Sequence, residues 1–107
     1  MKIRNVVVFT VLGLSIAGAK TYEINLDSDS KAGNATLKAG KYNVAVDASK
    51  VRFIDATSGK STEADGKVVT ADKKFTNTMV DSSQVNGVAE IREIDLGGTK
   101  TRIEFQP

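Results

Sequence analysis

Residues 86–105 read NGVAEIREIDLGGTKTRIEF and carry the strongest structural signal in the chain. The dipeptides Asn86-Gly87 and Gly97-Gly98 favour the primed turns that join two antiparallel strands. A two-residue loop at Gly97-Gly98 predicts three facing pairs: Asp95 with Lys100, Glu93 with Arg102, and Ile94 with Thr101. Opposite charges then share one face, while Leu96, Ile103 and Phe105 join Ile94 on the other. A slip by one residue would exchange the two faces, so this register is the one predicted.

The same test at Asn86-Gly87 predicts a second register, with Val85 opposite Val88, Asp81 opposite Arg92, and Met79 opposite Ile94. Ile91 does not fit this register, because it falls on the charged face. It marks either a β-bulge or one exposed apolar residue. Together the two turns predict a three-stranded meander from about Phe75 to Phe105.

The residues before the meander read as further short strands. Tyr22, Ile24 and Leu26 alternate with polar residues, as a half-buried strand requires, and Asp27 to Asn34 reads as a polar loop. The remaining predicted strands are Ala35–Leu37 and Lys41–Val46, joined at Lys38-Ala39-Gly40, and then Val51–Asp55, Ser61–Glu63 and Lys67–Thr70. Turns at 47–50, at Ser58-Gly59 and at Asp65-Gly66 separate the later strands. The sequence thus predicts a single all-β domain over residues 20–107, a small sandwich or barrel of about seven or eight strands.

The first 19 residues have the three parts of a secretory signal peptide. Lys2 and Arg4 precede an apolar run from Val6 to Ile16, and Ala17-Gly18-Ala19 offers small residues for cleavage before Lys20. The run is shorter than the roughly 20 apolar residues that a membrane span needs. We therefore expect cleavage and export to the periplasm, the cell surface or the extracellular space, with no membrane contact afterwards.

Charge and composition narrow the partners. Removal of 19 of the 107 residues leaves 88, with thirteen basic and thirteen acidic side chains. A neutral domain has no basic patch for nucleic acid. Cysteine is absent, so the domain must depend on its apolar core instead of disulfides.

The residue inventory excludes several kinds of catalysis. The sequence contains neither His nor Cys, so histidine-dependent and thiol nucleophiles and the usual zinc ligands are missing. We expect no enzymatic activity, no catalytic residues, no cofactor and no metal.

Four short patterns have more ordinary interpretations. Asp27-Ser28-Asp29-Ser30-Lys31 begins like a calcium loop but has Lys31 at the fifth position and lacks the closing glutamate, so a solvated turn is expected, even though Asp47 and Asp55 could in principle join it. Asn34-Ala35-Thr36 is a glycosylation acceptor only in a eukaryotic secretory pathway. Gly59-Lys60-Ser61 matches the end of a phosphate-binding loop without its earlier glycine. Tyr22 and Tyr42 are in phase with aliphatic residues and are expected to face the core.

Two segments resemble a group of small exported bacterial β-proteins of uncharacterised function. One is the "leucine, x, alanine, glycine, x, tyrosine" hairpin at Leu37 to Tyr42, and the other is the closing hairpin from Glu90 to Thr101. The resemblance implies an envelope location and a β fold, and it implies no functional residues.

These observations predict a non-enzymatic exported module that binds a protein or glycan in the envelope or has a structural role there. The alternative is a subunit of an extracellular filament or polymer, assembled by β-strand exchange or by edge pairing.

Overall fold

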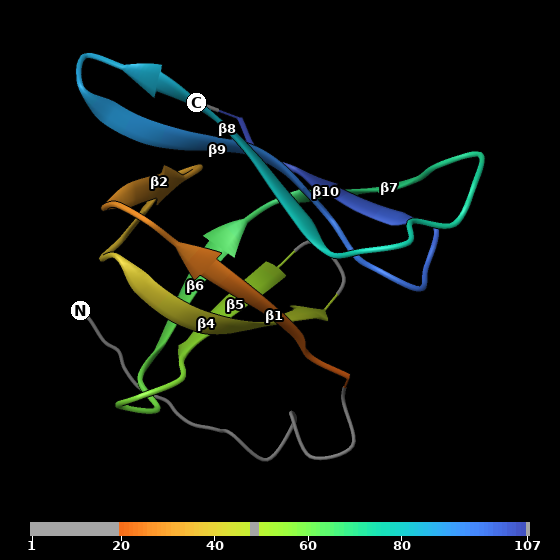
Figure 1. The fold of residues 1–107 in the computed structure, drawn as a ribbon, viewed down its shortest axis with the longest axis horizontal. Coiled ribbons are helices and arrows are strands. Elements are labelled where there is room, and N and C mark those ends of the chain that lie inside the picture. The colour runs from red at the N-terminus through yellow and green to blue at the C-terminus, as the bar shows by residue number, and fades with distance from the viewer. Residues whose placement is uncertain (1–19, 48–49, 107) are drawn as a thin grey trace.

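The computed structural model describes residues 20–47 and 50–106, which form two β-sheets packed face to face (Figure 1). Within these residues there are ten strands and no helix, so the all-β prediction is confirmed and the predicted number of strands was too low. The predicted signal peptide, residues 1–19, lies outside the described residues, as does the middle of the predicted turn at 47–50.

Sheet A is fully antiparallel, with four strands in the spatial order β1 (Tyr22–Leu26), β4 (Gly40–Asp47), β5 (Lys50–Asp55) and β6 (Ser61–Asp65). Sheet B follows the order β3 (Ala35–Leu37), β2 (Ser30–Ala32), β9 (Val88–Asp95), β10 (Thr101–Glu104) and β7 (Lys67–Thr70). The strand β8 (Met79–Val85) pairs with the opposite edge of β9. The two-sheet order makes the fold a sandwich.

β9 organises sheet B because three strands pair with it. β8 follows one edge along its whole length, while the other edge is shared by β2 in parallel and by β10 in antiparallel orientation. The predicted polar loop from Asp27 to Asn34 was therefore wrong in its second half, since β2 lies there. Ser30 and Ala32 of β2 are buried, and the Ser30 hydroxyl donates to the Ser28 carbonyl oxygen at 2.9 Å.

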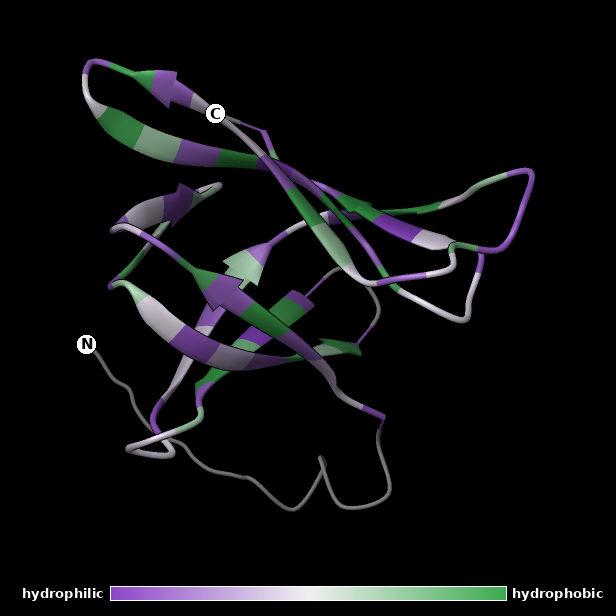
Figure 2. Ribbon diagram, viewed as in Figure 1, coloured by the Kyte–Doolittle hydropathy of each residue, from purple (hydrophilic) through white to green (hydrophobic). Residues whose placement is uncertain are grey.

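Apolar and polar residues alternate along the strands (Figure 2). Buried apolar residues of both sheets form one core cluster. Phe53 of β5 is completely buried and contacts an aromatic ring on each side. The Tyr42 ring lies edge-on at 6.4 Å, and the Phe105 ring, which follows β10, lies at 6.1 Å. The prediction that Tyr42 faces the core is confirmed, and Tyr22 packs against the core while partly exposed.

Two connections predicted as turns within one sheet instead carry the chain between the sheets. Lys38-Ala39 links β3 of sheet B to β4 of sheet A, so the resembling segment at Leu37 to Tyr42 is a crossing and not a hairpin. Gly66 links β6 to β7 in the same way. A Cβ atom there would lie 2.8 Å from Ile103 Cγ2, so the crossing requires glycine.

The meander of β8, β9 and β10 is confirmed, but the register predicted from Gly97-Gly98, between β9 and β10, was wrong. Arg102 lies opposite Asp95, Ile103 opposite Ile94, and Glu104 opposite Glu93. Each β10 residue is thus shifted by two positions from the prediction. Because side chains alternate with a period of two, this shift preserves the apolar and polar faces while changing every facing pair.

The register predicted from Asn86-Gly87, between β8 and β9, is confirmed at the turn, where Val85 lies opposite Val88, and changes further along. The register shifts between Asp81 and Ser82, and Arg92 is the extra residue. This is a β-bulge, one of the two alternatives for the misfit at Ile91. Beyond it, Asp81 faces Glu93 and Val80 faces Ile94, so the predicted pairs Asp81 with Arg92 and Met79 with Ile94 were wrong. The bulge leaves both Ile91 and Ile94 buried.

Candidate functional site

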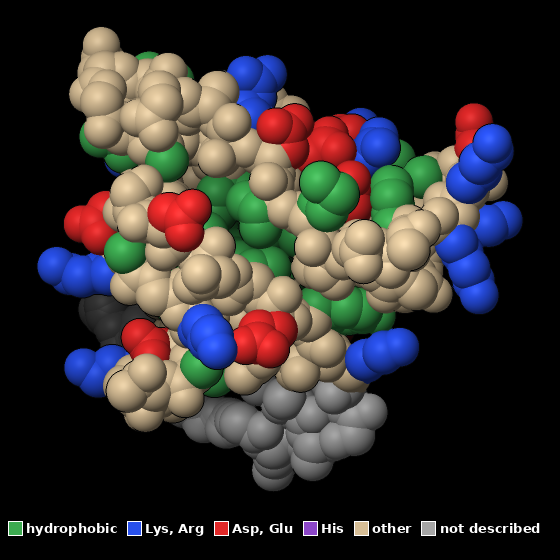
Figure 3. Space-filling view, viewed as in Figure 1, with side chains coloured by type: hydrophobic (Ala, Val, Ile, Leu, Met, Phe, Trp, Pro, Cys, Tyr) green, Lys and Arg blue, Asp and Glu red, His purple; other side chains and the backbone are tan. Residues whose placement is uncertain are grey.

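The outer face of sheet B, which points away from sheet A, carries a row of acidic side chains. The register places Asp81 of β8 opposite Glu93 of β9, and Glu93 opposite Glu104 of β10. Lys67 of β7 lies opposite Glu104 and ends the row. Figure 3 shows acidic side chains gathered over this part of the molecule, with basic side chains beside them. Like charges directly opposite each other destabilise a sheet. The row of acidic side chains therefore does not contribute to the stability of the fold.

Arg102 holds two of the acidic groups together. Its Nε lies 3.1 Å from Glu93 Oε2 and 3.2 Å from Asp95 Oδ1. The Phe75 ring covers the guanidinium at 5.6 Å from its centroid. The cation–π contact and the two carboxylates hold the Arg102 side chain in place. Its positive charge is paired with Glu93 and Asp95 and not with the other acidic groups of the row.

Glu93 is the acidic group whose protonation the site changes. Burial raises the pKa of the Glu93 carboxyl above its ordinary value of 4.5, and a hydrogen bond with Asp95 raises it further. The positive charge of Arg102 opposes this, whereas the negative charges of Asp95 and Asp81 add to it. The net effect is that the charged form of Glu93 is less stable in the folded protein than in the unfolded chain.

We expect Glu93→Gln to raise the thermal midpoint at pH 7. A raised native pKa means that the ionised carboxylate costs stability above that pKa. This cost shrinks as the pH falls and disappears below 4.5, where the native and unfolded forms are both protonated. Arg102 keeps its ion pair with Asp95 in the variant. The advantage should therefore shrink between pH 7 and pH 4.5, as measured by differential scanning calorimetry at several pH values. The control is Glu23→Gln, an exposed carboxylate of β1, and a lower midpoint for Glu93→Gln at pH 7 would contradict the expectation.

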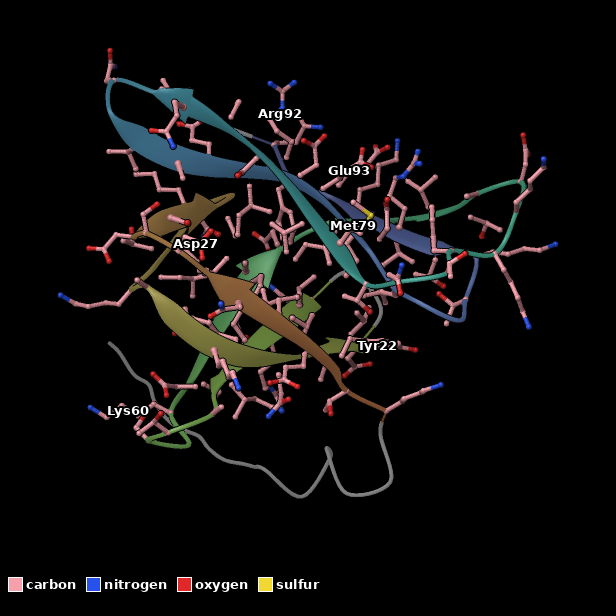
Figure 4. The ribbon with its side chains drawn as sticks, viewed as in Figure 1. Tyr22, Asp27, Lys60, Met79, Arg92 and Glu93 are labelled. Carbon is pink, nitrogen blue, oxygen red and sulfur yellow. The ribbon has the colours of Figure 1, made fainter. Side chains whose placement is uncertain are left out.

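A groove of about 400 Å³ lies along the same face. It is lined by residues of β8, β9 and β10 and by the two residues that follow β10: Asp81, Ser82, Ser83, Arg92, Glu93, Glu104, Phe105 and Gln106. The bulge directs Arg92 outward, and Figure 4 shows Arg92 and Glu93 on the outer side of sheet B. Arg92 forms no ion pair with any other residue in the described part of the chain. The groove therefore offers carboxylates, hydroxyls and one guanidinium to a polar ligand.

The short patterns found in the sequence lie elsewhere and have local roles. Asp29 Oδ1 accepts a hydrogen bond from the Ala39 N–H at 2.9 Å, which ties the loop before β2 to the crossing after β3. Asp55 Oδ1 accepts from the Thr57 and Ser58 N–H groups and caps the turn before β6. These two bonds lower the pKa of the exposed Asp55 carboxyl.

Lys60 lies in that turn, far from the groove (Figure 4), and Asn34 lies in the turn between β2 and β3. Among residues 20–47 and 50–106 no group of three or more acidic, His or Cys side chains is placed to hold a metal ion.

The groove could not be predicted from the sequence, for a specific reason. The predicted register paired Glu93 with Arg102, which left no acidic row. The row exists because β10 is shifted by two residues and because the bulge at Arg92 moves Asp81 opposite Glu93. The only local signal was Ile91, whose misfit indicated that the register must change nearby.

The described residues contain no helix long and apolar enough to cross a membrane. No family model, curated protein or solved structure matches this chain.

Proposed function

We propose that the protein is a non-enzymatic binding module, exported from a bacterial cell, that binds a cationic segment of an envelope protein in the groove on sheet B. The proposal of export is supported by Lys2 and Arg4, the apolar run after them and the small residues at 17–19. The proposal of a non-enzymatic role is supported by a sequence without His or Cys.

The row of Asp81, Glu93 and Glu104 is the observation that carries the binding proposal. Facing carboxylates cost folding stability, and a cationic ligand would relieve that cost when it binds. Arg102 is already shared between Glu93 and Asp95, so Asp81 and Glu104 are the groups that a ligand can neutralise. A neutral glycan would not compensate these charges, which favours a basic protein segment as the partner.

We expect a lysine octapeptide to bind this protein and a glutamate octapeptide not to bind, when each is titrated at low salt by calorimetry or NMR. Exposed charge pairs contribute about 0.2–1 kcal/mol each, so Glu104→Gln should weaken binding about 1.4- to fivefold. Binding should weaken with added salt. It should also weaken as the pH falls through the raised pKa of Glu93, because that carboxylate is then neutralised.

The matched control is Glu23→Gln, which removes the same charge from sheet A. Equal weakening by Glu23→Gln and Glu104→Gln would show that the peptide responds to overall charge and not to the groove. A neutral oligosaccharide that binds in place of the lysine peptide would also overturn the proposed partner class.

A second candidate, a subunit of an extracellular filament, is favoured by the open edge of β8. Assembly by strand exchange would need the apolar segment from Val6 to Leu12 to remain on the exported chain. The intact mass of the protein purified from its native host distinguishes the two candidates. A chain that begins at Lys20 supports the binding module, whereas a chain that retains Met1 to Ala19 supports the filament.

A further inference from the structure

β8 is an unusually open sheet edge. It spans seven residues, and it pairs with β9 alone among the strands of the described chain. Proteins protect such edges with charged side chains, prolines or short strands. The other edge strands are shorter: β1, β6 and β7 carry Glu23, Glu63 and Lys67, and β3 has only three residues. β8 carries one charge, Asp81, in its middle.

The exposed apolar side chains of the described residues gather around this strand. Four large hydrophobic residues are exposed: Val68, Met79, Val85 and Val88. Met79 is the most exposed, at 62 %. Met79 and Val85 are the two ends of β8, and Val88 lies directly opposite Val85 on β9.

Met79 and Val85 also point to the same side of the sheet. Val80, Ser82 and Gln84 lie opposite the buried residues Ile94, Ile91 and Ala89, so these three point to the inner side of the sheet, where Ser82 and Gln84 remain exposed. Alternation then places Met79, Asp81, Ser83 and Val85 on the outer face. Figure 4 shows Met79 on the part of sheet B that also carries Glu93.

We propose that β8 pairs with β8 of a second copy of this chain, antiparallel and centred on Ser82, so that the two sheets B join into one continuous sheet. A two-fold axis through Ser82 places Met79 opposite Val85 of the second copy, Val80 opposite Gln84, and Asp81 opposite Ser83. Each end of the ladder then gathers three apolar side chains: Val85 and Val88 of one copy and Met79 of the other. Three of the four exposed large hydrophobic residues become covered.

The sequence of β8 favours this register over its neighbours. A two-fold axis perpendicular to a sheet keeps inner residues opposite inner residues and outer opposite outer. The pairing can therefore shift only by two positions, which moves the centre of the ladder by one residue, to Asp81 or to Ser83. A ladder centred on Asp81 would put two like charges opposite each other, which destabilises a pair of strands. A ladder centred on Ser83 would pair Asp81 with Val85. Both shifts would also leave either Met79 or Val85 outside the ladder.

The pairing is closed, because an isologous contact uses the same edge on both copies. It therefore predicts two copies and no filament. The paired edge includes Asp81, Ser82 and Ser83, which also line the groove, but the pairing needs no ligand there, so it can be tested apart from the proposed function.

Cysteine scanning tests the register directly, because the natural sequence contains no cysteine. Directly opposite residues in an antiparallel pair have Cα atoms about 4.5–5.5 Å apart, which a disulfide can bridge. We expect Ser82→Cys, made in the full chain and mildly oxidised after purification, to form a covalent dimer. Ser83→Cys is the matched control. It should stay monomeric on denaturing gels, because Ser83 faces Asp81 of the second copy and not itself.

Sedimentation equilibrium of the unmodified protein should give the mass of two copies at micromolar concentration. Met79→Lys should raise the dissociation constant about tenfold or more, because it disrupts both apolar ends of the ladder. Val68→Lys changes an exposed apolar residue on β7 and should leave the constant unchanged. A monomer at 100 µM, or crosslinking of Ser83→Cys as efficient as that of Ser82→Cys, would overturn the proposal.

Discussion

Replacement of Phe53 by alanine is expected to lower the free energy of unfolding by about 3–5 kcal/mol. Phe53 is completely buried in the middle of β5, where its ring lies between Tyr42 of the same sheet and Phe105 from the end of sheet B. Truncation would leave a cavity where the two sheets meet. Since small domains are stable by only about 5–15 kcal/mol, much of the stability would be lost.

Urea denaturation followed by circular dichroism measures this effect. Phe75→Ala is the matched control, because Phe75 is partly exposed and covers Arg102 on the outer face. It should cost markedly less than Phe53→Ala. If Phe53→Ala does not fold, Phe53→Leu gives a graded version, with an expected loss of about 1–2 kcal/mol. Equal losses for Phe53→Ala and Phe75→Ala would contradict the place of Phe53 at the centre of the core.

Alternation of apolar and polar residues was sufficient to predict the strands with a clear inner face. Ile24, Leu26, Tyr42 and Val44 are buried as the pattern required. Such strands are predictable because burial of one face dominates their energetics. β2 was missed because its buried residues are Ser30 and Ala32, which are too small and too polar to give that signal. It becomes a strand by pairing in parallel with β9, a contact that lies far away in the sequence.

The register between β9 and β10 shows where local patterns stop being informative. A two-residue loop and a four-residue loop give the same faces, because they differ by a shift of two. The pairs of opposite charge that favoured the shorter loop contribute only about 0–1 kcal/mol each when exposed. The observed loop runs from Leu96 to Thr101, with the Leu96 N–H donating to the Thr101 carbonyl oxygen at 3.0 Å. Docking of this loop against residues 75–78 outweighs the charge pairs.

The candidate site could not be predicted for the same reason. Its acidic row depends on the shifted register and on the bulge, and both are set by tertiary contacts. The sequence contained the residues but not their arrangement. The open edge of β8 was easier to foresee in part, since Met79 to Val85 lacks proline and lysine, although only the structure shows that no other described strand covers it.

Gly97→Ala is expected to cost about 2–3 kcal/mol of unfolding free energy, the range for forcing an added methyl group into a packed site. A Cβ atom at this position would lie 2.7 Å from the Thr78 N and 2.8 Å from the Asn77 carbonyl carbon. Both are backbone atoms, so the segment before β8 would have to move as a whole. The Gly97 N–H donates to Thr78 Oγ1 at 2.9 Å, and the Gly98 N–H donates to the Phe75 carbonyl oxygen at 2.7 Å.

Gly98→Ala is the control in the same loop. Gly98 has a positive φ of 78°, and no atom lies within 4 Å of an added Cβ. Its replacement by alanine should cost only the strain of holding a non-glycine residue in the left-handed conformation, about 1–2 kcal/mol. The two variants should differ most in amide hydrogen exchange. Gly97→Ala should remove the protection of the Phe75 and Gly98 N–H groups, whereas Gly98→Ala should keep it.

The same displacement has a consequence for the proposed dimer. Residues 77–78 fix the point at which β8 begins, so Gly97→Ala should disturb Met79 and reduce disulfide formation by Ser82→Cys in the double variant. Gly98→Ala combined with Ser82→Cys should crosslink as well as Ser82→Cys alone. Retained exchange protection in Gly97→Ala, together with unchanged crosslinking, would show that the loop does not position the edge strand.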